Sequence, residues 1–402
     1  MLAIVTTHPI QYQVPLWRAL AENGGIPFEV WYLSHHAAKK SYDSAFRTEF
    51  AWDIDLLAGY PSRLLRVPPN STPNAFFESR IIGSPTSLLQ DNQAKVLWIQ
   101  GWQVAAYWQM AWAAKRSGCR VWLRGESNLL APRIPWKEPI KRLLLGSLFS
   151  RVDSFLCIGS ANRRLYREYG IPASRLHNAP YAVDNFHFAA NASTLLPNRN
   201  EIRRAFNIPD GAVCVLFCGK FVHKKFPQHV VQAVSLARQQ KPDKEIHILF
   251  VGSGELGDSL RAQCNVVYDA AGTHSSTPTQ AKPHSPNASF AGFLNQSEIS
   301  RAYVAADCLI LPSDFGETWG LVVNEANASG LPCIISNRCG CAEDMGTIAG
   351  NRIFNFGDIA ALADEICKQS SVRKPTLPNL HLPNFAETVN TVAQLYKAES
   401  SS

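Results

Sequence analysis

Two glutamates, Glu317 and Glu325, lie eight positions apart in a run whose residue types suit a sugar joined to phosphate. Between them the chain passes from a glycine-containing loop into a predicted helix, whose apolar stripe begins at Leu321. The first turn of a helix leaves N–H groups unpaired, and these groups and the helix dipole favour an anion. A carboxylate accepts two hydrogen bonds side by side, which suits vicinal hydroxyls. We therefore expect one acid to hold a hexose, the other a ribose, and the amides between them a phosphate bridge.

This run resembles the signature of the retaining glycosyltransferases of family 4, within glycosyltransferase group 1, which have the GT-B fold. Two acids at this spacing would be weak evidence alone, but the complete series of matches is specific. The matching segments are Pro312-Ser313, Glu317, Thr318-Trp319-Gly320-Leu321, Glu325-Ala326 and Gly330-Leu331-Pro332. The alternative is an ordinary helix with one capping acid and one surface acid. The resemblance implies an α/β chain of two facing, Rossmann-like, doubly wound domains with a cleft between them.

A second matching segment follows the predicted strand Val213 to Cys218. Gly219 with Lys220, and then Lys225, match the family's paired cations, so the resemblance implies that both lysines contact a donor diphosphate. Fixed ammonium groups there would stabilise the charge that the leaving nucleoside diphosphate gains. Surface lysines without a partner are the alternative.

The resemblance also implies roles for the two acids and their neighbours. Glu317 is the catalytic candidate, which contacts donor hydroxyls beside the anomeric carbon, while Glu325 binds the ribose and the aromatic turn at Phe293 borders the nucleobase. The implied donor-binding residues are Gly219, Lys220, Lys225, Phe293, Thr318, Trp319, Gly320, Leu321 and Glu325. The co-substrate would be a nucleoside-diphosphate sugar of the UDP or GDP type, without a further cofactor.

The acceptor-side candidates lie in the first half of the chain. His8 and Gln11 occupy the tight loop after the predicted strand Leu2 to Thr6, at the edge where open parallel sheets bind ligands. These two side chains alternatively only satisfy the turn. Arg124 and Glu126 follow another predicted strand, where the family often has a histidine lining the acceptor cleft, so we name them as catalytic candidates. A salt bridge within the loop is the alternative.

We predict a metal-independent site. Asp53-Ile54-Asp55 matches the D-x-D pattern that other glycosyltransferases use to hold a metal, but three residues are unspecific and an edge strand explains them equally well. Cys339 and Cys341 form a lone C-x-C without a second pair at zinc-ligand spacing.

Composition excludes several classes of protein. With 402 residues, 46% hydrophobic and 18% charged, the chain has a soluble globular composition with room for two domains. Ten irregularly spaced cysteines favour a reducing cytosol over a disulfide framework, and we expect no signal peptide. The net charge of +7 suits phosphorylated ligands and anionic membranes. We expect no nucleic-acid partner, because zinc-finger and ribonucleoprotein patterns are missing.

Residues 133–151 predict a basic amphipathic helix with Trp136, Leu143, Leu144, Leu148 and Phe149 on its apolar side. Such a helix can lie on an anionic membrane and bring an enzyme to a lipid-linked acceptor. The alternative is that it packs on its own sheet with a solvated basic face. We expect a cytoplasmic protein, with peripheral contact to the inner face of the membrane through this segment.

We predict an acceptor-side domain over residues 1–190, a polar linker over 189–200 and a nucleotide-sugar-binding domain over 201–380. Residues 381–402 would form a last helix that crosses back to the first domain, and 268–289 a mobile surface insertion. The predicted function is retaining transfer of a hexose-type sugar to a hydroxyl of a glycan or lipid-linked acceptor, in bacterial surface polysaccharide or glycolipid synthesis. The alternatives are a non-catalytic nucleotide or glycan-binding protein and a sugar-nucleotide epimerase on the same fold.

Overall fold

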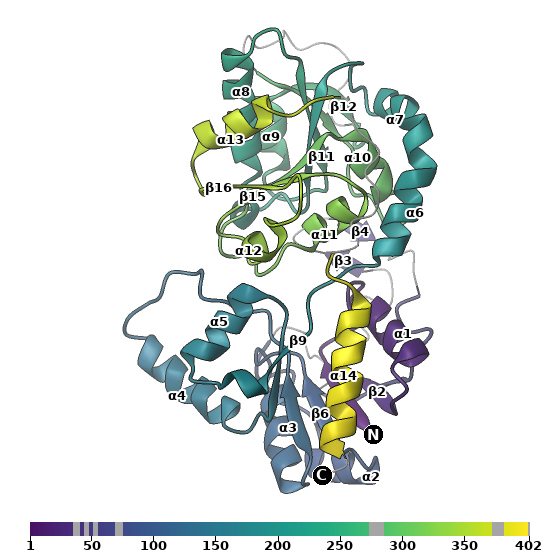
Figure 1. Ribbon diagram of the computed structural model, residues 1–402, viewed down its shortest axis with the longest axis vertical. Helices are drawn as coiled ribbons and strands as arrows, with labels where there is room; N and C mark the ends of the chain where they lie inside the picture. The colour runs from purple at the N-terminus through teal and green to yellow at the C-terminus, as the bar shows by residue number, and fades with distance from the viewer. Residues whose placement is uncertain are drawn as a thin grey trace. The chain divides into compact units, whose positions relative to one another are not determined.

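The computed structural model describes residues 1–34, 41–43, 48–50, 55–68, 75–272, 285–371 and 382–400. It divides the chain into two compact units (Figure 1). The first unit consists of Met1–Ser41, Ile54–Val183 and Pro383–Ser402, and the second of Tyr42–Asp53 and Asp184–Leu382.

The first unit is built on a seven-stranded sheet in which all strands run parallel. Its strands, in spatial order, are β5 (Ser62–Leu64), β2 (Phe28–Tyr32), β1 (Leu2–Thr6), β6 (Val96–Ile99), β7 (Arg120–Leu123), β8 (Ser154–Cys157) and β9 (Leu176–Asn178). Its helices are α1 (Val14–Asn23), α2 (Pro85–Asp91), α3 (Ala105–Arg116), α4 (Glu138–Phe149), α5 (Ser160–Glu168), the short 3₁₀ turn η1 (Ala173–Arg175) and α14 (Phe385–Ser400).

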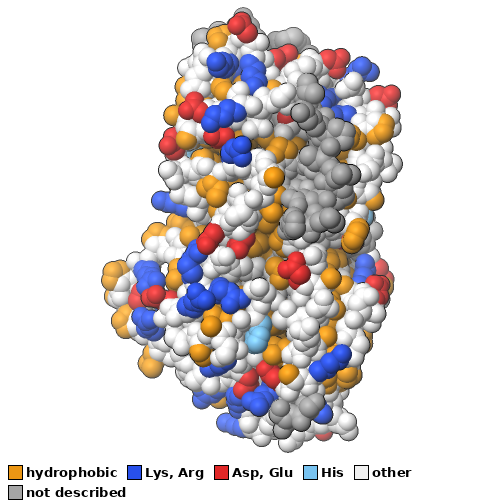
Figure 2. Space-filling view, viewed as in Figure 1, with side chains coloured by type: hydrophobic (Ala, Val, Ile, Leu, Met, Phe, Trp, Pro, Cys, Tyr) orange, Lys and Arg blue, Asp and Glu red, His pale blue; other side chains and the backbone are white. Residues whose placement is uncertain are grey.

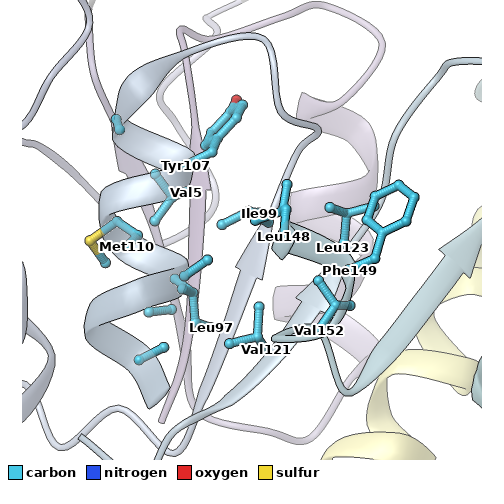
Figure 3. Close-up of a cluster of buried hydrophobic side chains, with 14 of the residues drawn as sticks. Val5, Leu97, Ile99, Tyr107, Met110, Val121, Leu123, Leu148, Phe149 and Val152 are labelled. Carbon is cyan, nitrogen blue, oxygen red and sulfur yellow. The ribbon is translucent and has the colours of Figure 1, made fainter. Parts of the chain in front are cut away.

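The sequence favours this sheet because its central strands are largely apolar runs, as in β6 (VLWI), which suits strands that are covered on both faces. Figure 3 shows one side of the core, where Val5, Leu97 and Val121 from neighbouring strands meet Tyr107 and Met110 of α3. All five side chains are fully buried.

The second unit repeats this architecture with a second parallel sheet of seven strands. Its strands, in spatial order, are β12 (Asn265–Asp269), β13 (Asn287–Phe290), β11 (Ile246–Val251), β10 (Val213–Cys218), β14 (Cys308–Leu311), β15 (Cys333–Ser336) and β16 (Arg352–Phe354). Its helices are α6 (Asn185–Leu195), η2 (Leu196–Asn198), α7 (Arg199–Ala205), η3 (His223–Lys225), α8 (Pro227–Gln240), α9 (Gly257–Gln263), α10 (Ile299–Ala305), α11 (Leu321–Ala328), α12 (Ala342–Met345) and α13 (Ile359–Cys367). A separate two-stranded sheet pairs β3 (Ser41–Asp43) with β4 (Thr48–Phe50).

Aromatic rings fill much of the second core. Phe250 stacks on Phe290 with ring centroids 4.9 Å apart. The ring of Phe217 lies 6.0 Å from that of Phe250, and the ring of Phe221 lies 5.9 Å from Phe250 and 6.3 Å from Phe290. Phe221 stands in the loop that leaves β10, so this core also fixes the first residues after the strand.

The segment predicted to be a polar linker, residues 189–200, is helical instead. The carboxylate of Asp184 accepts a hydrogen bond from the His187 amide (2.9 Å) and caps α6. Phe188 is buried, with its ring 6.1 Å from that of Tyr303 on α10. The prediction was wrong because one buried aromatic and a capping aspartate hold this helix, which has almost no periodic apolar stripe.

The C-terminal helix α14 belongs to the first unit, where it packs on α1 (Figure 1). The Glu399 carboxylate accepts hydrogen bonds from the Trp122 indole (2.8 Å) and the Ser154 hydroxyl (2.7 Å) on neighbouring strands. In the second unit, the predicted insertion 268–289 is ordered at both ends, which lie in β12 and β13, while residues 273–284 lie outside the described residues.

Candidate functional site

The loop after β10 is held by two glycines of the loop after β11. A Cβ atom at Gly252 would collide with the carbonyl oxygen of Gly219, and one at Gly254 would lie 2.7 Å from the carbonyl oxygen of Phe221. Both glycines also have left-handed φ angles (122° and 148°). The G-x-G of this segment therefore lets two backbones approach closely and fixes where the chain leaves β10.

Lys225, at the end of the 3₁₀ turn η3, forms an ion pair with the Glu317 carboxylate from the loop after β14. The Asp314 amide donates to the carbonyl oxygen of Lys224 (3.1 Å), so backbone contacts join the same two loops. Burial alone would lower the pKa of Lys225, but the neighbouring Glu317 outweighs burial and raises it. Lys225 therefore carries a full positive charge at neutral pH.

Helix α11 begins directly after Gly320, whose φ of 114° is left-handed. A Cβ atom here would lie 2.7 Å from a methyl group of Leu311 and 3.2 Å from the Cys341 sulfur. The indole of Trp319 is buried and donates to the Asn324 side-chain oxygen (3.0 Å). The loop is thus packed tightly onto the end of β14, and the first amides of α11 are held beside Glu317.

Glu325 is only 4% exposed and lies on α11. The Tyr303 hydroxyl on α10 donates a hydrogen bond to its carboxylate. Burial, reinforced by the Glu325 charge, raises the pKa of the Cys218 thiol to about 12, so this thiol remains protonated. Sequence reasoning missed Tyr303, because no short motif connects α10 to α11.

The other predicted donor-side residues lie at the same edge of the second sheet. Lys220 follows Gly219 after β10, and Thr318 lies between Glu317 and Trp319. Phe293 follows Gly292, whose carbonyl oxygen accepts a hydrogen bond from the Gly252 amide (2.7 Å). Because the strands are parallel, the loops after β10, β11, β13 and β14 all start from their carboxyl ends.

In the first unit, Arg124 and Glu126 both contact Tyr181, which sequence reasoning did not single out. The Arg124 guanidinium lies 4.6 Å from the centre of the Tyr181 ring and donates to the carbonyl oxygens of Ala179 (3.0 Å) and Pro180 (3.1 Å). The Tyr181 hydroxyl donates to the Glu126 carboxylate. Burial lowers the pKa of Arg124 and raises that of Tyr181 well above its usual range.

His8 and Gln11 lie in the turn between β1 and α1, at the carboxyl edge of the first sheet. The Thr7 hydroxyl and the His8 Nδ1 atom are 3.0 Å apart. Gln11 is 8% exposed, and its side-chain oxygen has no hydrogen-bond partner among the described residues. Arg124 follows β7 in the same parallel sheet, so its loop leaves the same edge.

The D-x-D pattern lies partly outside the described residues, since Asp53 is not among them, while the Asp55 carboxylate accepts a hydrogen bond from the Leu57 amide (2.9 Å). Cys339 and Cys341 are buried, and burial raises the pKa of both thiols. Within the described part of the chain, the acidic, histidine and cysteine side chains form no cluster of three that could hold a metal ion.

Residues 198–371 match the family described as "Glycosyl transferases group 1", and residues 11–182 match the "Glycosyl transferase 4-like domain". The chain belongs to the group 1 glycosyltransferases.

Curated relatives match this group 1 glycosyltransferase over part of their length. It is 31% identical over 179 residues to D-inositol 3-phosphate glycosyltransferase of Pseudarthrobacter chlorophenolicus, covering 44% of this chain and 37% of that protein. It is 30% identical over 145 residues to spore coat protein SA of Bacillus subtilis, covering 36% and 35%. The matched stretches thus span little more than a third of these relatives.

Solved structures resemble the glycosyltransferase over its whole length. Anabaena HepE in complex with UDP and glucose aligns over 100% of this chain and 94% of its own, with a TM-score of 0.57 and 15% identity. WaaG, a glycosyltransferase involved in lipopolysaccharide biosynthesis, aligns over 99% and 95%, with a TM-score of 0.59 and 13% identity. Together with the two parallel sheets, these similarities confirm the predicted GT-B fold class.

Proposed function

We propose that this protein is a retaining, metal-independent glycosyltransferase that moves a sugar from a nucleoside-diphosphate sugar to a hydroxyl acceptor. The observation that carries the proposal is the meeting of Lys225, Glu317 and the start of α11 at one sheet edge. An ammonium group and helix amides suit a diphosphate, and a carboxylate beside them suits sugar hydroxyls. The complex of HepE with UDP and glucose supports a donor of this class.

In the proposed mechanism, the donor changes the partner of Lys225. In the structure its ammonium group is paired with Glu317. A bound diphosphate competes for the ammonium group and frees the carboxylate for the donor hydroxyls beside the anomeric carbon. Lys220 and the amides after Gly320 complete the grip, and Glu325 holds the ribose next to Tyr303. These groups stabilise the negative charge that develops on the leaving diphosphate.

No protein general base is required in this mechanism. The glycosidic bond to the diphosphate breaks, the sugar passes to the acceptor oxygen, and the departing phosphate oxygen takes the acceptor proton. We assign acceptor binding to Arg124, Glu126, His8 and Gln11, which share one edge of the first sheet. The buried guanidinium and the carboxylate of Glu126 supply hydrogen bonds of both polarities to a hydroxylated acceptor.

We further propose that the acceptor is a glycan or lipid-linked glycan used for surface polysaccharide or glycolipid synthesis, and that the protein works in the cytoplasm at the inner face of the membrane. The similarity to WaaG, which is involved in lipopolysaccharide biosynthesis, supports this class of acceptor. No helix in the described ranges is both long and apolar enough to cross a membrane, so the proposed contact is peripheral.

The surface that carries this contact is one side of α4 and the turn before it. Five large apolar residues are exposed there: Ile134 (47%), Trp136 (68%), Ile140 (56%), Leu143 (76%) and Leu144 (53%). Leu145, Leu148 and Phe149 form the buried side instead. Packing on its own sheet therefore accounts for only one side of this helix.

Basic side chains border the exposed apolar residues. Lys137, Lys141 and Arg142 lie in the same stretch, and the Lys137 ammonium is 5.0 Å from the centre of the Trp136 ring. Figure 2 shows hydrophobic side chains next to Lys and Arg at the edge of the first unit where Figure 1 draws α4. Apolar residues flanked by cations fit an anionic lipid surface, which takes up the former and attracts the latter.

Vesicle binding tests this contact. The protein should sediment with vesicles of phosphatidylcholine mixed with phosphatidylglycerol, bind pure phosphatidylcholine weakly, and lose binding when Leu143 and Leu144 are both changed to serine. Phe77→Ser is the matched control, since Phe77 is equally exposed (77%) elsewhere in the first unit. Equal sedimentation of the Leu143 and Leu144 variant, or self-association through α4 seen by light scattering without lipid binding, would refute it.

Donor hydrolysis separates the transferase from its alternatives. The protein should slowly release free sugar from one member of a panel of radiolabelled UDP, GDP and ADP sugars, and the released sugar should keep its anomeric configuration. A pure binding protein would raise the unfolding midpoint with the same nucleotide without releasing sugar. An epimerase would return a nucleotide sugar of altered configuration. Either of these results would refute the proposed transfer.

A further inference from the structure

Phe226 has a backbone conformation that is unusual for a bulky residue. Its φ of 48° and ψ of 47° are left-handed, and it joins the 3₁₀ turn η3 to α8. Side chains other than glycine disfavour this region, because Cβ crowds the following carbonyl group. Among the described residues other than glycine, only Gln93 and Asn207 also have positive φ angles. Such strain persists where the surrounding structure holds the residue in place.

Contacts between aromatic rings keep Phe226 in this conformation. The Phe226 ring lies 4.8 Å from the His229 ring one turn later in α8, and 4.8 Å from Phe356 at an interplanar angle of 87°. The Arg338 guanidinium covers the Phe356 ring at 4.6 Å. The Phe356 amide donates to the Asn337 side-chain oxygen (3.0 Å). Phe226 is therefore fixed against loops that follow β15 and β16.

The backbone of this strained residue adjoins the donor-site lysine. Phe226 closes η3 by donating its amide to the carbonyl oxygen of His223 (3.1 Å), and the Lys225 amide donates to that of Val222 (3.0 Å). The two residues before Phe226 hold the neighbouring loop: the Lys224 carbonyl accepts a hydrogen bond from the loop after β14, and the Lys225 ammonium is paired with Glu317. The direction of the lysine side chain thus depends on a turn that the Phe226 ring anchors.

We propose that Phe226 is a positioning residue, held by His229 and Phe356, that aims the Lys225 ammonium at the donor diphosphate. This inference rests on the proposed function, since it assigns Phe226 a purpose only if Lys225 grips the diphosphate. The ring, rather than the strained backbone, does the positioning. Removing the ring lets the turn relax and displaces the ammonium group, whereas changes that keep an aromatic ring preserve its direction.

Substitutions at Phe226 and Phe356 test the contact between the two rings. Phe226→Gly removes the strain and the ring together. Calorimetric titration with UDP or GDP, whichever the protein binds, should show binding weakened by about tenfold, because the charged group of Lys225 is displaced. Phe226→Tyr keeps the ring and should bind within about twofold of the unaltered protein. Phe356→Leu removes the other half of the contact and should resemble Phe226→Gly, which keeps the test available if one variant fails to fold.

A double-mutant cycle with Lys225 distinguishes positioning of the ammonium group from a general loosening of the turn, because a general loosening would lower nucleotide affinity with or without Lys225. In a Lys225→Met background, Phe226→Gly should change nucleotide affinity less than about twofold, because its effect passes through the missing ammonium group. The inference is overturned if Phe226→Gly leaves affinity unchanged in the otherwise unaltered protein, or if it costs the same factor with and without Lys225. If Lys225→Met itself leaves affinity unchanged, the proposed function fails instead.

Discussion

The donor-side site of the second unit and the Tyr181 cluster of the first are built differently. In the second unit, glycines let backbones approach within contact distance, and two loops are joined by the Lys225 and Glu317 pair. In the first unit, Arg124 and Glu126 meet on a tyrosine more than fifty residues later, and Gly125 between them lies against the side chains of Trp102 and Tyr166 rather than against another backbone. One site depends on backbone geometry and the other on side chains from distant segments.

This difference follows from what each region is proposed to bind. A diphosphate requires amides and ammonium groups at fixed distances, so its site tolerates little change in loop geometry. An acceptor presents hydroxyl groups, which side chains of several types can bind. We therefore expect substitutions in the second unit to affect nucleotide binding and catalysis, and those in the first to affect acceptor use.

The largest expected effect is at Glu317. Glu317→Gln should lower the rate of sugar transfer by about 10² to 10³-fold, because an interaction made in the transition state is lost. Steady-state transfer rates measure it, and Glu298→Gln, an exposed glutamate just before α10, is the matched control. If Glu317→Gln transferred sugar at the rate of the unaltered protein, Glu317 would have no catalytic role, and the second unit would not be distinguished from the first by its contribution to catalysis.

Gly320 tests the dependence on backbone geometry. Gly320→Ala should lower the free energy of unfolding by about 3 kcal/mol, since it combines a left-handed φ with a close approach to Leu311. Gly272→Ala is the control, because its φ is also positive (64°) but nothing lies within 4 Å, and it should cost only about 1 kcal/mol. Equal losses in urea unfolding would show that the packing at Gly320 contributes nothing.

Tyr181 tests the side-chain design of the first unit. Tyr181→Phe removes the hydrogen bond to Glu126 but keeps the ring beneath Arg124, so unfolding free energy should fall by about 1 to 2 kcal/mol. The KM for acceptor should rise while nucleotide affinity is unchanged. Weaker nucleotide binding in this variant would contradict the division of roles between the units.

A smaller, pH-dependent effect is expected from His247 in the second sheet. Burial, with the nearby Arg203 charge, lowers the pKa of His247 to about 3, so this residue is neutral in the folded state. The unfolded chain binds a proton near pH 6.5, so stability should fall as pH drops below about 6.5, with a slope of up to about 1.4 kcal/mol per pH unit.

Calorimetry between about pH 7.5 and about pH 5.5, one unit either side of the unfolded-state pKa of about 6.5, measures this slope. His247→Gln should flatten it, because Gln does not bind a proton in this pH range. Its side-chain amide can keep a hydrogen bond to the Ser289 hydroxyl, which lies 2.9 Å from the His247 Nε2 atom. An unaltered slope in the variant would assign the acid sensitivity to other groups.

The central strands were predictable because strands of a covered parallel sheet are continuous apolar runs, as in Val213 to Cys218. Edge strands such as β5 and β16 lack such runs, and they are defined by pairing with a neighbour rather than by their own residues. The helix α6 was missed because its stability comes from contact with α10, which no local pattern shows.

The residues of the candidate site divide in the same way, into those that local sequence indicates and those that only tertiary contacts bring together. The sequence brought Glu317, Gly320 and Lys225 to attention because their roles depend on local chain geometry and on spacing. It did not identify Tyr303 and Tyr181, which become partners of Glu325 and Glu126 only when separate segments fold together. Nor did periodicity reveal that Leu143 and Leu144 face solvent, since an apolar stripe does not state what covers it.

Titration of UDP and GDP into the Lys225→Met protein is the decisive experiment, because we propose that this ammonium group is the main contact to the diphosphate. We expect affinity to fall by about 100-fold, consistent with the loss of a buried charge-assisted contact, while Lys241→Met, an exposed lysine at the end of α8, has no effect. Glu317→Gln should bind the same nucleotide as tightly or more tightly, since its carboxylate no longer competes for Lys225. Unaltered nucleotide affinity of the Lys225→Met protein would show that Lys225 does not bind the diphosphate.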